Sequence, residues 1–362
     1  MQTGIKCSVF RGGTSKGPYF LKEALPADVA MRDKVLLSVM GSPDVRQIDG
    51  IGGSNPLTSK AAIVSRSTRN DADVDYLFLQ VFVDQPRVDI TQNCGNILAG
   101  VGPFAIEQGL VRAENGHTKV RIHMVNSESI AIADIETPGR DVNYDGTARI
   151  DGVPGTAAPI MLDFLDIAGS ASGSLLPTGN TRDVIEGIPV TLVDNGMPVI
   201  VVRAADLGVT GYETPADLEA NKDLVALKER IRLKAGPMMN LGDVTKKSVP
   251  KVSLIAPAED GGTISTRTFI PHRIHEAVGV LGAVSVATAA MLPGSVAIDM
   301  AKSSGSGSER EIDVEHPTGF FSVRVGIGKD GRTVERAALL RTARKLMDGT
   351  VYVPHAVWNG RL

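Results

Sequence analysis

The chain has 362 residues, a formal net charge of −3 and 43% hydrophobic residues. A chain of this length usually forms about two domains and buries enough apolar surface to need no disulfides. The hydrophobic content excludes a disordered chain, and the charge does not favour nucleic-acid binding. The 39 glycines, beside only 4% aromatic residues, indicate many tight turns and close backbone approaches.

Cysteine usage and targeting signals point to one compartment. Cys7 and Cys94 are the two cysteines, too few for a disulfide framework, and neither belongs to a zinc-ligand spacing. Residues 1–17 lack the apolar stretch of a signal peptide, and no window reaches the ~20 apolar residues of a membrane helix. We therefore expect a cytoplasmic protein that binds no metal, no nucleic acid and no membrane.

Strand patterns dominate the first half. Residues 5–10 and 74–83 alternate and are rich in β-branched and aromatic residues. Residues 119–136 read as two strands about a polar turn. Between these strands, 94–110 carries apolar residues at helical spacing, with small residues at its start. Pro103 is expected to kink or restart this helix.

The second half repeats this plan. In chain order, the sequence predicts a hairpin over 188–202, a charged helix over 214–235, strands over 252–256 and 263–270, a small-residue helix over 274–292, a hairpin over 311–327 and a last helix over 337–348. The first hairpin turns at Asp194-Asn195-Gly196, where Asn-Gly is a strong turn signal. Basic residues near the end of the last helix suit the helix dipole.

Each half therefore runs strand, small-residue helix, hairpin. Repetition at a period near half the chain implies two similar domains with a cleft between them. We expect an α+β fold with domains 1–183 and 184–362, divided within the polar, turn-rich segment 177–187. A helix of Ala, Gly, Ser and Val can sit at the centre of a wrapped sheet and point its free N–H groups toward the domain interface.

Two residues are candidates for proton transfer. Lys60 begins the buried run 61–64, and burial lowers a lysine's pKa, which is how lysine becomes a base near neutral pH. The alternative is a surface lysine whose charge reaches solvent from the strand end. Cys94 opens the first small-residue helix, whose free amides would stabilise a thiolate. A small buried hydrophobe is the alternative there, and is the main interpretation for Cys7.

Polar residues among glycines are candidates for substrate binding. The segment RGGTSKG at 11–17 lacks the spacing of a nucleotide-binding loop and suits a carboxylate-binding nest or an ordinary hairpin turn. His272 and Arg273 precede the second small-residue helix and could bind a carboxylate or form a surface cluster. The full set of substrate-binding candidates is Thr14, Ser15, Ser54, Ser59, Asn93, Gly95, Asn96, His272 and Arg273.

Six motifs carry a resemblance that spans the chain in order. They are RGGTSKG at 11–17, IDGIGGSNPLTSK at 48–60, NCGN at 93–96, IDGVPGTAAP at 150–159, DNGMPV at 194–199 and PHRIHEA at 271–277. The sequence resembles the PrpF-type isomerases, which share the diaminopimelate epimerase-like fold. Within that family it is most similar to 4-oxalomesaconate tautomerases of gallate and protocatechuate catabolism.

The resemblance implies a fold and a chemistry. The fold would be two pseudo-symmetric halves, each a mostly antiparallel sheet wrapped around a central helix. The chemistry would be cofactor-independent proton transfer on a small unsaturated keto-polycarboxylate, with Lys60 and Cys94 flanking the substrate. Two-thiol racemases of this fold place a cysteine at each central helix, and the second helix start here has none. That departure favours a double-bond shift over racemisation.

A mechanism and its alternatives follow from the resemblance. Lys60 would remove an acidified C–H proton, the helix amides with Thr14, Ser15 and Ser54 would hold the dienolate, and Lys60 or Cys94 would return the proton. The nearest alternative is an aconitate isomerase of the methylcitrate pathway. A non-catalytic carboxylate-binding or accessory protein is a further alternative, and a homodimer is compatible with the sequence.

Overall fold

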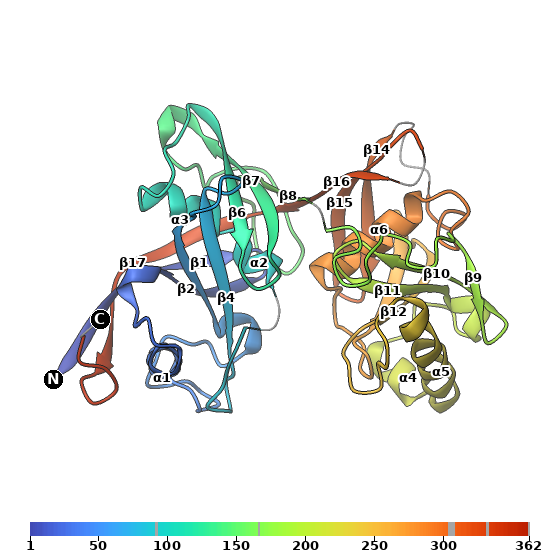
Figure 1. Ribbon diagram of the computed structural model, residues 1–362, viewed down its shortest axis with the longest axis horizontal. Coiled ribbons are helices and arrows are strands. Elements are labelled where there is room, and N and C mark those ends of the chain that lie inside the picture. The colour runs from blue at the N-terminus through green and yellow to red at the C-terminus, as the bar shows by residue number, and fades with distance from the viewer. Residues whose placement is uncertain (91–92, 166, 303–307, 331–332, 361–362) are drawn as a thin grey trace. The chain divides into compact units, whose positions relative to one another are not determined.

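The computed structural model describes residues 1–90, 93–165, 167–302, 308–330 and 333–360 (Figure 1). The chain divides into two compact units. Unit 1 comprises Met1–Asp163 and Leu340–Leu362, and unit 2 comprises Phe164–Leu339. In the described part of the chain, none of the helices is long and apolar enough to cross a membrane.

Unit 1 contains most of the first half of the chain. Its strands are β1 (Gln2–Gly12), β2 (Ser15–Leu21), β3 (Lys60–Arg66), β4 (Val74–Val81), β5 (Val88–Asp89), β6 (Gly116–Met124), β7 (Ser129–Thr137) and β17 (Ala343–Pro354). Its helices are α1 (Val29–Met40), α2 (Gly95–Leu98) and α3 (Val101–Glu107), with short 3₁₀ helices at Lys22–Ala24, Pro56–Thr58 and Pro138–Arg140. The chain leaves unit 1 within β8 (Ile160–Leu165).

Unit 2 is continuous in sequence. Its strands are β9 (Asp183–Ile185), β10 (Ile188–Asp194), β11 (Pro198–Arg203), β12 (Lys251–Pro257), β13 (Ile264–Phe269), β14 (Glu309–His316) and β15 (Gly319–Ile327). Its helices are α4 (Pro215–Ala220), α5 (Lys222–Met238) and α6 (Val280–Met291), with a 3₁₀ helix at Ala204–Leu207. The chain returns to unit 1 within β16 (Val334–Arg341).

The two units share one strand plan, which confirms the expected α+β class and internal repetition. In unit 1, β1–β2, β3–β4 and β6–β7 pair antiparallel, while β2–β3 and β4–β6 pair parallel. In unit 2, β10–β11, β12–β13 and β14–β15 pair antiparallel, while β11–β12 and β13–β14 pair parallel. Each unit is thus three hairpins joined through two parallel contacts.

Helices cover both faces of each sheet. The small-residue helix α6 is buried from Gly282 to Met291 and contacts β10, β11, β14 and β15, because its short side chains let strands approach closely. In unit 1, α2 and α3 occupy the corresponding place in the chain, between β4 and β6. On the opposite faces, α1 packs through Val35, Leu36 and Val39 into one core, and α5 packs through Leu224 and Ile231 into another.

Both small-residue helices differ from their predicted bounds. The first, expected over 94–110, is two short helices that break at Gly100, a residue close to the Tyr19 hydroxyl. Pro103 lies in the first turn of α3, where its missing N–H costs nothing, so the helix does restart there. The second, expected over 274–292, begins only at Val280, because Ile274 still pairs with Phe269 as a β-bridge.

The predicted C-terminal helix over 337–348 is wrong. These residues form the end of β16 and the start of β17. β17 pairs antiparallel with the whole of β1, from Gln2 opposite Pro354 to Gly12 opposite Ala343, and Figure 1 draws the red β17 beside the blue β1. Long-range pairing thus overrides a local helical pattern.

The same pairing alters the domain division. The expected boundary at 183/184 assigns the C-terminus to the second domain. The compact units instead meet in the chain at Asp163/Phe164 and at Leu339/Leu340, because β17 completes the sheet of unit 1. Unit 1 is therefore built from two separate stretches of sequence.

Candidate active site

Lys60 is the first residue of β3, and its side chain is buried in unit 1. The residue is 8% exposed, and its Nζ donates a hydrogen bond of 2.5 Å to Oε1 of Gln80. Nζ also lies 5.2 Å from the ring centroid of Phe78. In the described part of the chain, no carboxylate lies within ion-pair distance of Nζ. The ammonium is thus held by a neutral oxygen and an aromatic face.

Gln80 is oriented by the backbone that precedes Lys60. Lys60 and Gln80 are direct cross-strand partners in the β3–β4 register. The Gln80 side-chain nitrogen donates to the carbonyl oxygens of Pro56 (3.1 Å) and Ser59 (2.9 Å). These two bonds fix the amide so that its oxygen faces Nζ. The sequence offered a signal for Gln80, because it is the polar residue on the buried face of an otherwise apolar strand.

Ser59 and Ser54 belong to the support of this segment. Ser59 is fully buried, and its hydroxyl accepts a hydrogen bond of 2.7 Å from the Gln47 side chain. The Gln47 oxygen accepts from the Ser54 amide, while the Ser54 hydroxyl donates to the Arg46 carbonyl. The Ser54 hydroxyl thus has a backbone acceptor within unit 1, and its expected role as a donor to substrate stays a prediction.

Cys94 is the residue that caps α2. Its backbone is extended, with φ of −130° and ψ of 101°, and its carbonyl accepts from the Leu98 amide (2.9 Å) and the Tyr76 hydroxyl (3.3 Å). The Cys94 side chain is a free, partly exposed thiol. Gly95 is the first residue of α2. The predicted position of the thiol at a helix start is thus observed.

The turn between β1 and β2 packs on the residue that follows Gly95. The Thr14 amide donates to Oδ1 of Asn96 at 3.4 Å. A Cβ on Gly12 would lie 2.5 Å from the Asn96 carbonyl oxygen, so only glycine allows this approach. Ser15 is 1% exposed, and its hydroxyl has no hydrogen-bond partner among the described residues. A buried, unpartnered hydroxyl in this turn is a potential donor to a ligand.

Asn93 and three further residues complete the surroundings of Cys94. The Asn93 amide nitrogen donates to the Ser127 hydroxyl at 2.5 Å. Tyr19 and Tyr76 are fully buried, and burial raises the pKa of both phenols well above 10. Burial lowers the pKa of the Arg341 guanidinium, whereas the neighbouring Cys94 acts in the opposite sense. A positive charge beside a thiol stabilises the thiolate. Local sequence patterns give no signal for Arg341.

Lys60 and Cys94 lie over the same face of the unit 1 sheet. Tyr76 and Gln80 are four residues apart on β4, and alternate residues of a strand share a face. Tyr76 bonds the Cys94 carbonyl and Gln80 bonds Lys60. Tyr19, which is in register with Ala62 of β3, donates from the same side to the Ile97 carbonyl of α2. Both predicted proton-transfer residues therefore face the α2 side of the sheet.

His272 and Arg273 are not at a helix start. Their side chains, in unit 2, are 64% and 84% exposed, and they lie 4.0 Å and 3.7 Å from the carboxylates of Glu229 and Glu219 respectively. The Ile270 amide donates to the Arg273 carbonyl, so the segment is a tight turn after β13. The exposed surface cluster is the alternative that this geometry favours.

His275 and Lys251 are partly exposed basic residues of the same region. Burial and the charge of Lys251 lower the pKa of His275, and burial and the charge of Arg232 lower the pKa of Lys251. Lys251 is the first residue of β12, the strand that corresponds to β3 in the shared plan, so it is the topological counterpart of Lys60. The N-cap of α6 is Gly279, the counterpart of Cys94. Unit 2 thus repeats the lysine and lacks the thiol.

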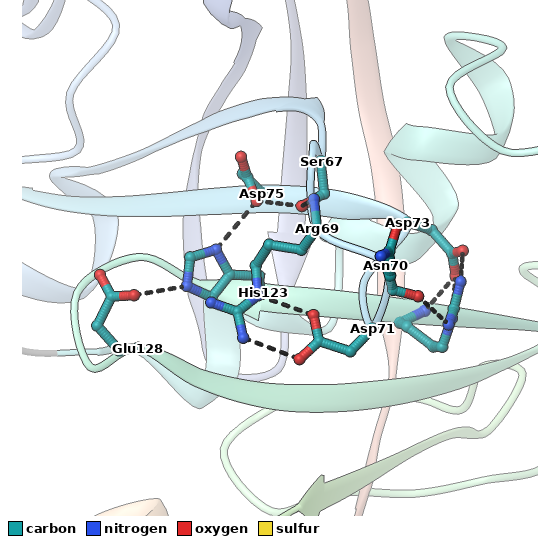
Figure 2. A network of polar contacts seen from close by, with 9 residues as sticks. Ser67, Arg69, Asn70, Asp71, Asp73, Asp75, His123 and Glu128 are labelled. Carbon is teal, nitrogen blue, oxygen red and sulfur yellow. Dashed lines mark hydrogen bonds and ion pairs between the residues drawn. The ribbon is translucent and has the colours of Figure 1, made fainter.

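A polar network around His123 has metal-binding residue types without a metal-binding geometry. Figure 2 shows Asp75 and Glu128 on opposite nitrogens of the imidazole, at 3.0 Å from Nδ1 and 3.1 Å from Nε2. Beside it, Arg69 pairs with Asp71. The two carboxylates on His123 do not converge on one point. No cluster of three His, Cys, Asp or Glu residues able to hold a metal occurs in the described ranges.

A model of the PrpF protein family matches residues 2–354. The chain belongs to the PrpF family. It is 60% identical over 347 residues to a protein named (4E)-oxalomesaconate Delta-isomerase from Novosphingobium sp. (strain KA1), covering 96% of this chain and 97% of the relative. It is 55% identical over 359 residues to the 4-oxalomesaconate tautomerase of Pseudomonas putida KT2440, covering 99% of each chain.

Other relatives and solved structures are less similar in sequence. A 2-methyl-aconitate isomerase of Shewanella oneidensis is 36% identical over 392 residues, with 98% of each chain covered. The crystal structure of a methylitaconate-delta-isomerase has a TM-score of 0.90 at 40% identity, covering 98% of this chain and 97% of that chain. A probable proline racemase from Agrobacterium radiobacter K84 has a TM-score of 0.51 at 14% identity, covering 96% and 92%. This last similarity concerns the fold alone, and it confirms the expected fold class.

Proposed function

We propose that this chain is an isomerase that catalyses a 1,3-proton shift on 4-oxalomesaconate without a cofactor. Two relatives above 50% identity carry names for isomerisation or tautomerisation of that compound. The observation that carries the proposal is the buried Lys60 ammonium, held by a neutral amide rather than a carboxylate. A buried Nζ that is held by a neutral oxygen, with no carboxylate bound to it, is placed to exchange a proton with a substrate, which is the task of a general base.

The proposed reaction begins at Lys60. Its unprotonated Nζ takes a proton from a carbon acidified by an adjacent conjugated carbonyl or carboxylate group. The electron pair of that C–H bond is delocalised into a dienolate. The backbone amides at the start of α2 and the unpartnered Ser15 hydroxyl are suited to hydrogen-bond the developing negative charge.

The proton then returns at the far end of the conjugated system. Either the Lys60 ammonium delivers it, or the Cys94 thiol does and Lys60 reprotonates the thiolate. Both routes conserve protons and electrons and leave the enzyme unchanged. Arg341, beside Cys94, would stabilise the transient thiolate of the second route.

Only one of the two small-residue helices, α2, has a cysteine at its start, and this favours the proton shift over racemisation. Racemisation by two thiols requires a second acid on the opposite face of the substrate. The residue at the start of α6 is Gly279, which carries no side chain. A single lysine–cysteine pair is sufficient for a shift in which both carbons exchange protons on one face.

Two variants test the proposal. Lys60→Met is expected to lower kcat by ~10²–10⁴-fold and to abolish deuterium incorporation from D₂O into the remaining substrate. Cys94→Ser is expected to reduce turnover while exchange continues, if the thiol only returns the proton. The matched control is Cys7→Ser, a buried thiol on the other face of the sheet, which should retain turnover. Near-normal turnover of the Lys60 variant would contradict the mechanism.

A substrate panel separates the alternatives. Purified protein is incubated with 4-oxalomesaconate, cis-aconitate and 2-methyl-aconitate, and proton NMR in D₂O follows each. Both reactions place deuterium on carbon in D₂O, so the bonds of the product distinguish them: an allylic shift moves the C=C bond and leaves the ketone in place, whereas ketonisation converts an enol C–OH into a C=O. If the protein converts an aconitate faster than 4-oxalomesaconate, the alternative function of an aconitate isomerase is supported. Binding without turnover of any compound would support a non-catalytic carboxylate-binding or accessory protein.

We also propose a cytoplasmic location and a homodimer. The location is supported by two free cysteines, Cys7 and Cys94. Light scattering coupled to gel filtration tests the dimer, for which a mass near 76 kDa is twice the 38.1 kDa of the chain.

A further inference from the structure

A second polar pocket lies within unit 1, apart from the contacts of Lys60. Its volume is about 270 Å³, enough for a small polycarboxylate. Its walls come from the end of β1, the start of β17 and the loop 144–157. This loop contains residues 150–157 of the IDGVPGTAAP motif, which the proposed mechanism does not use. The lining includes Arg11, Tyr144, Asp145, Thr342 and Arg344.

Two arginines face each other in this pocket. Arg11 of β1 and Arg344 of β17 are direct partners in the antiparallel register. Like charges at directly opposite positions destabilise a sheet. In the described part of the chain, neither guanidinium forms an ion pair. Burial and then the charge of Arg344 lower the pKa of Arg11.

Arg11 is held with part of its guanidinium already occupied. Its Nη1 donates to the carbonyl oxygen of Gly13 and to both the carbonyl and hydroxyl oxygens of Thr342, each at 3.0 Å. The Nε and Nη2 donors have no hydrogen bond among the described residues. A guanidinium fixed on one side and open on the other is arranged to bind a carboxylate with two hydrogen bonds.

The acidic residues near the pocket do not neutralise the arginines. Glu107 accepts a hydrogen bond from the Tyr144 hydroxyl at 2.9 Å and pairs with Lys345 at 2.9 Å. Asp145 is the one acidic residue in the lining, and it is not within ion-pair distance of either guanidinium. The pocket therefore has two positive charges and one negative charge.

The pocket adjoins the turn that supports Cys94. A Cβ on Gly152, in the loop, would lie 3.1 Å from Cγ2 of Thr14, and the Thr14 amide bonds Asn96. We propose that Arg11 and Arg344 bind a carboxylate group of a small polycarboxylate in this pocket. This inference rests on the proposed function for the class of ligand. The carboxylate belongs either to the substrate itself or to a second free polycarboxylate.

The test measures binding of tricarballylate, a saturated tricarboxylate that has no double bond to shift. Calorimetry at low ionic strength is performed on the wild type, Arg344→Gln, Arg344→Lys and Arg344→Glu. The Arg344→Gln variant should bind tricarballylate at least about tenfold more weakly. The Arg344→Lys variant should keep part of the affinity, because lysine retains the positive charge but lacks the paired N–H donors of a guanidinium. The control is Arg112→Gln, which removes an exposed arginine of unit 1 outside the pocket.

The Arg344→Glu variant distinguishes a specific loss of binding from a loss caused by misfolding. It replaces a like-charge cross-strand pair by an opposite-charge pair with Arg11, so its melting temperature should rise while tricarballylate binding is lost. A rise in KM for the Gln variant, with kcat retained, assigns the carboxylate to the substrate. Lost binding with unchanged KM assigns it to a second molecule.

Two outcomes would overturn the proposal. One is tricarballylate affinity within twofold of wild type in both the Gln and Glu variants. The other is an equal loss in the Arg112 control. Because tricarballylate binding needs no turnover, an inactive protein that still binds it through Arg344 would refute the proposed function and leave this site intact.

Discussion

Lys60 and Gln80 face each other across β3 and β4, with the lysine Nζ 2.5 Å from the glutamine oxygen. We predict that Gln80→Glu, which replaces that neutral oxygen by a carboxylate, will hold Lys60 as an ammonium ion. A carboxylate in contact with Nζ forms an ion pair that favours the charged form of the lysine, so kcat at neutral pH should fall about 10–100-fold in a steady-state assay.

The matched control is Gln85→Glu, an exposed position in the loop after β4. Its kcat should match that of the wild type. An unchanged kcat for Gln80→Glu would mean that Lys60 does not act as the base.

The two cysteines should differ strongly in reactivity. Cys7 is 4% exposed, and burial raises its pKa to about 11. At pH 8 only ~0.1% of a thiol with that pKa is thiolate, the form that reacts. Iodoacetamide should therefore modify Cys94 in the native protein and leave Cys7 unmodified, as measured by peptide mass spectrometry. In urea both should react, and comparable native rates would contradict the buried position of Cys7.

Stability at mildly acidic pH should depend on His275. Burial and the charge of Lys251 lower the pKa of His275 below its ordinary value of 6.5, and its Nδ1 accepts a hydrogen bond of 2.9 Å from the Ala277 amide. Below pH 6.5 the unfolded chain binds a proton that the folded chain resists, so the unfolding free energy falls as pH decreases. In the His275→Gln variant, the unfolding free energy measured with urea should decrease less between pH 7 and pH 5 than it does in the wild type.

The exposed His355 provides the comparison for that experiment. His355→Gln should show the same pH dependence of stability as the wild type. If the unfolding free energy of the His275 variant changes with pH as steeply as that of the wild type, His275 does not cause the acid destabilisation.

Two neighbouring residues of β17, Tyr352 and Val353, should differ in how much a charged substitution destabilises the protein. Val353 is fully buried in the core that α1 covers, whereas Tyr352 is 58% exposed. Val353→Asp should destabilise unit 1 by about 3 kcal/mol or more, because an unpaired carboxylate enters an apolar core. Tyr352→Asp should change the melting temperature little. Equal effects in calorimetry would contradict the burial pattern of β17.

Local sequence patterns were sufficient to predict the elements and site residues that depend on one short segment of the chain. Strand alternation located β1 and β4, and the small residues after Asn93 located the helix that Cys94 begins. Lys60 was found because it begins a buried apolar run. The expected cleft between the halves stays a prediction.

Features that depend on distant partners could not be predicted. The segment that holds Arg341 and Ala343 looks helical alone, and only the register with β1 makes it strand. His272 and Arg273 were expected at a helix start, but the sequence does not show that their segment forms a turn after β13, which leaves both side chains exposed. Gln80 matters through its position opposite Lys60, which is a property of the strand pairing.

The division of unit 1 between the two ends of the chain has a consequence for biosynthesis. A ribosome releases β1 first and β17 last, so the edge of β1 that β17 covers stays without that partner until nearly the whole chain has emerged. Unit 2, which is one continuous stretch, has all its strands available earlier. The half that is translated first is therefore the half that is completed last.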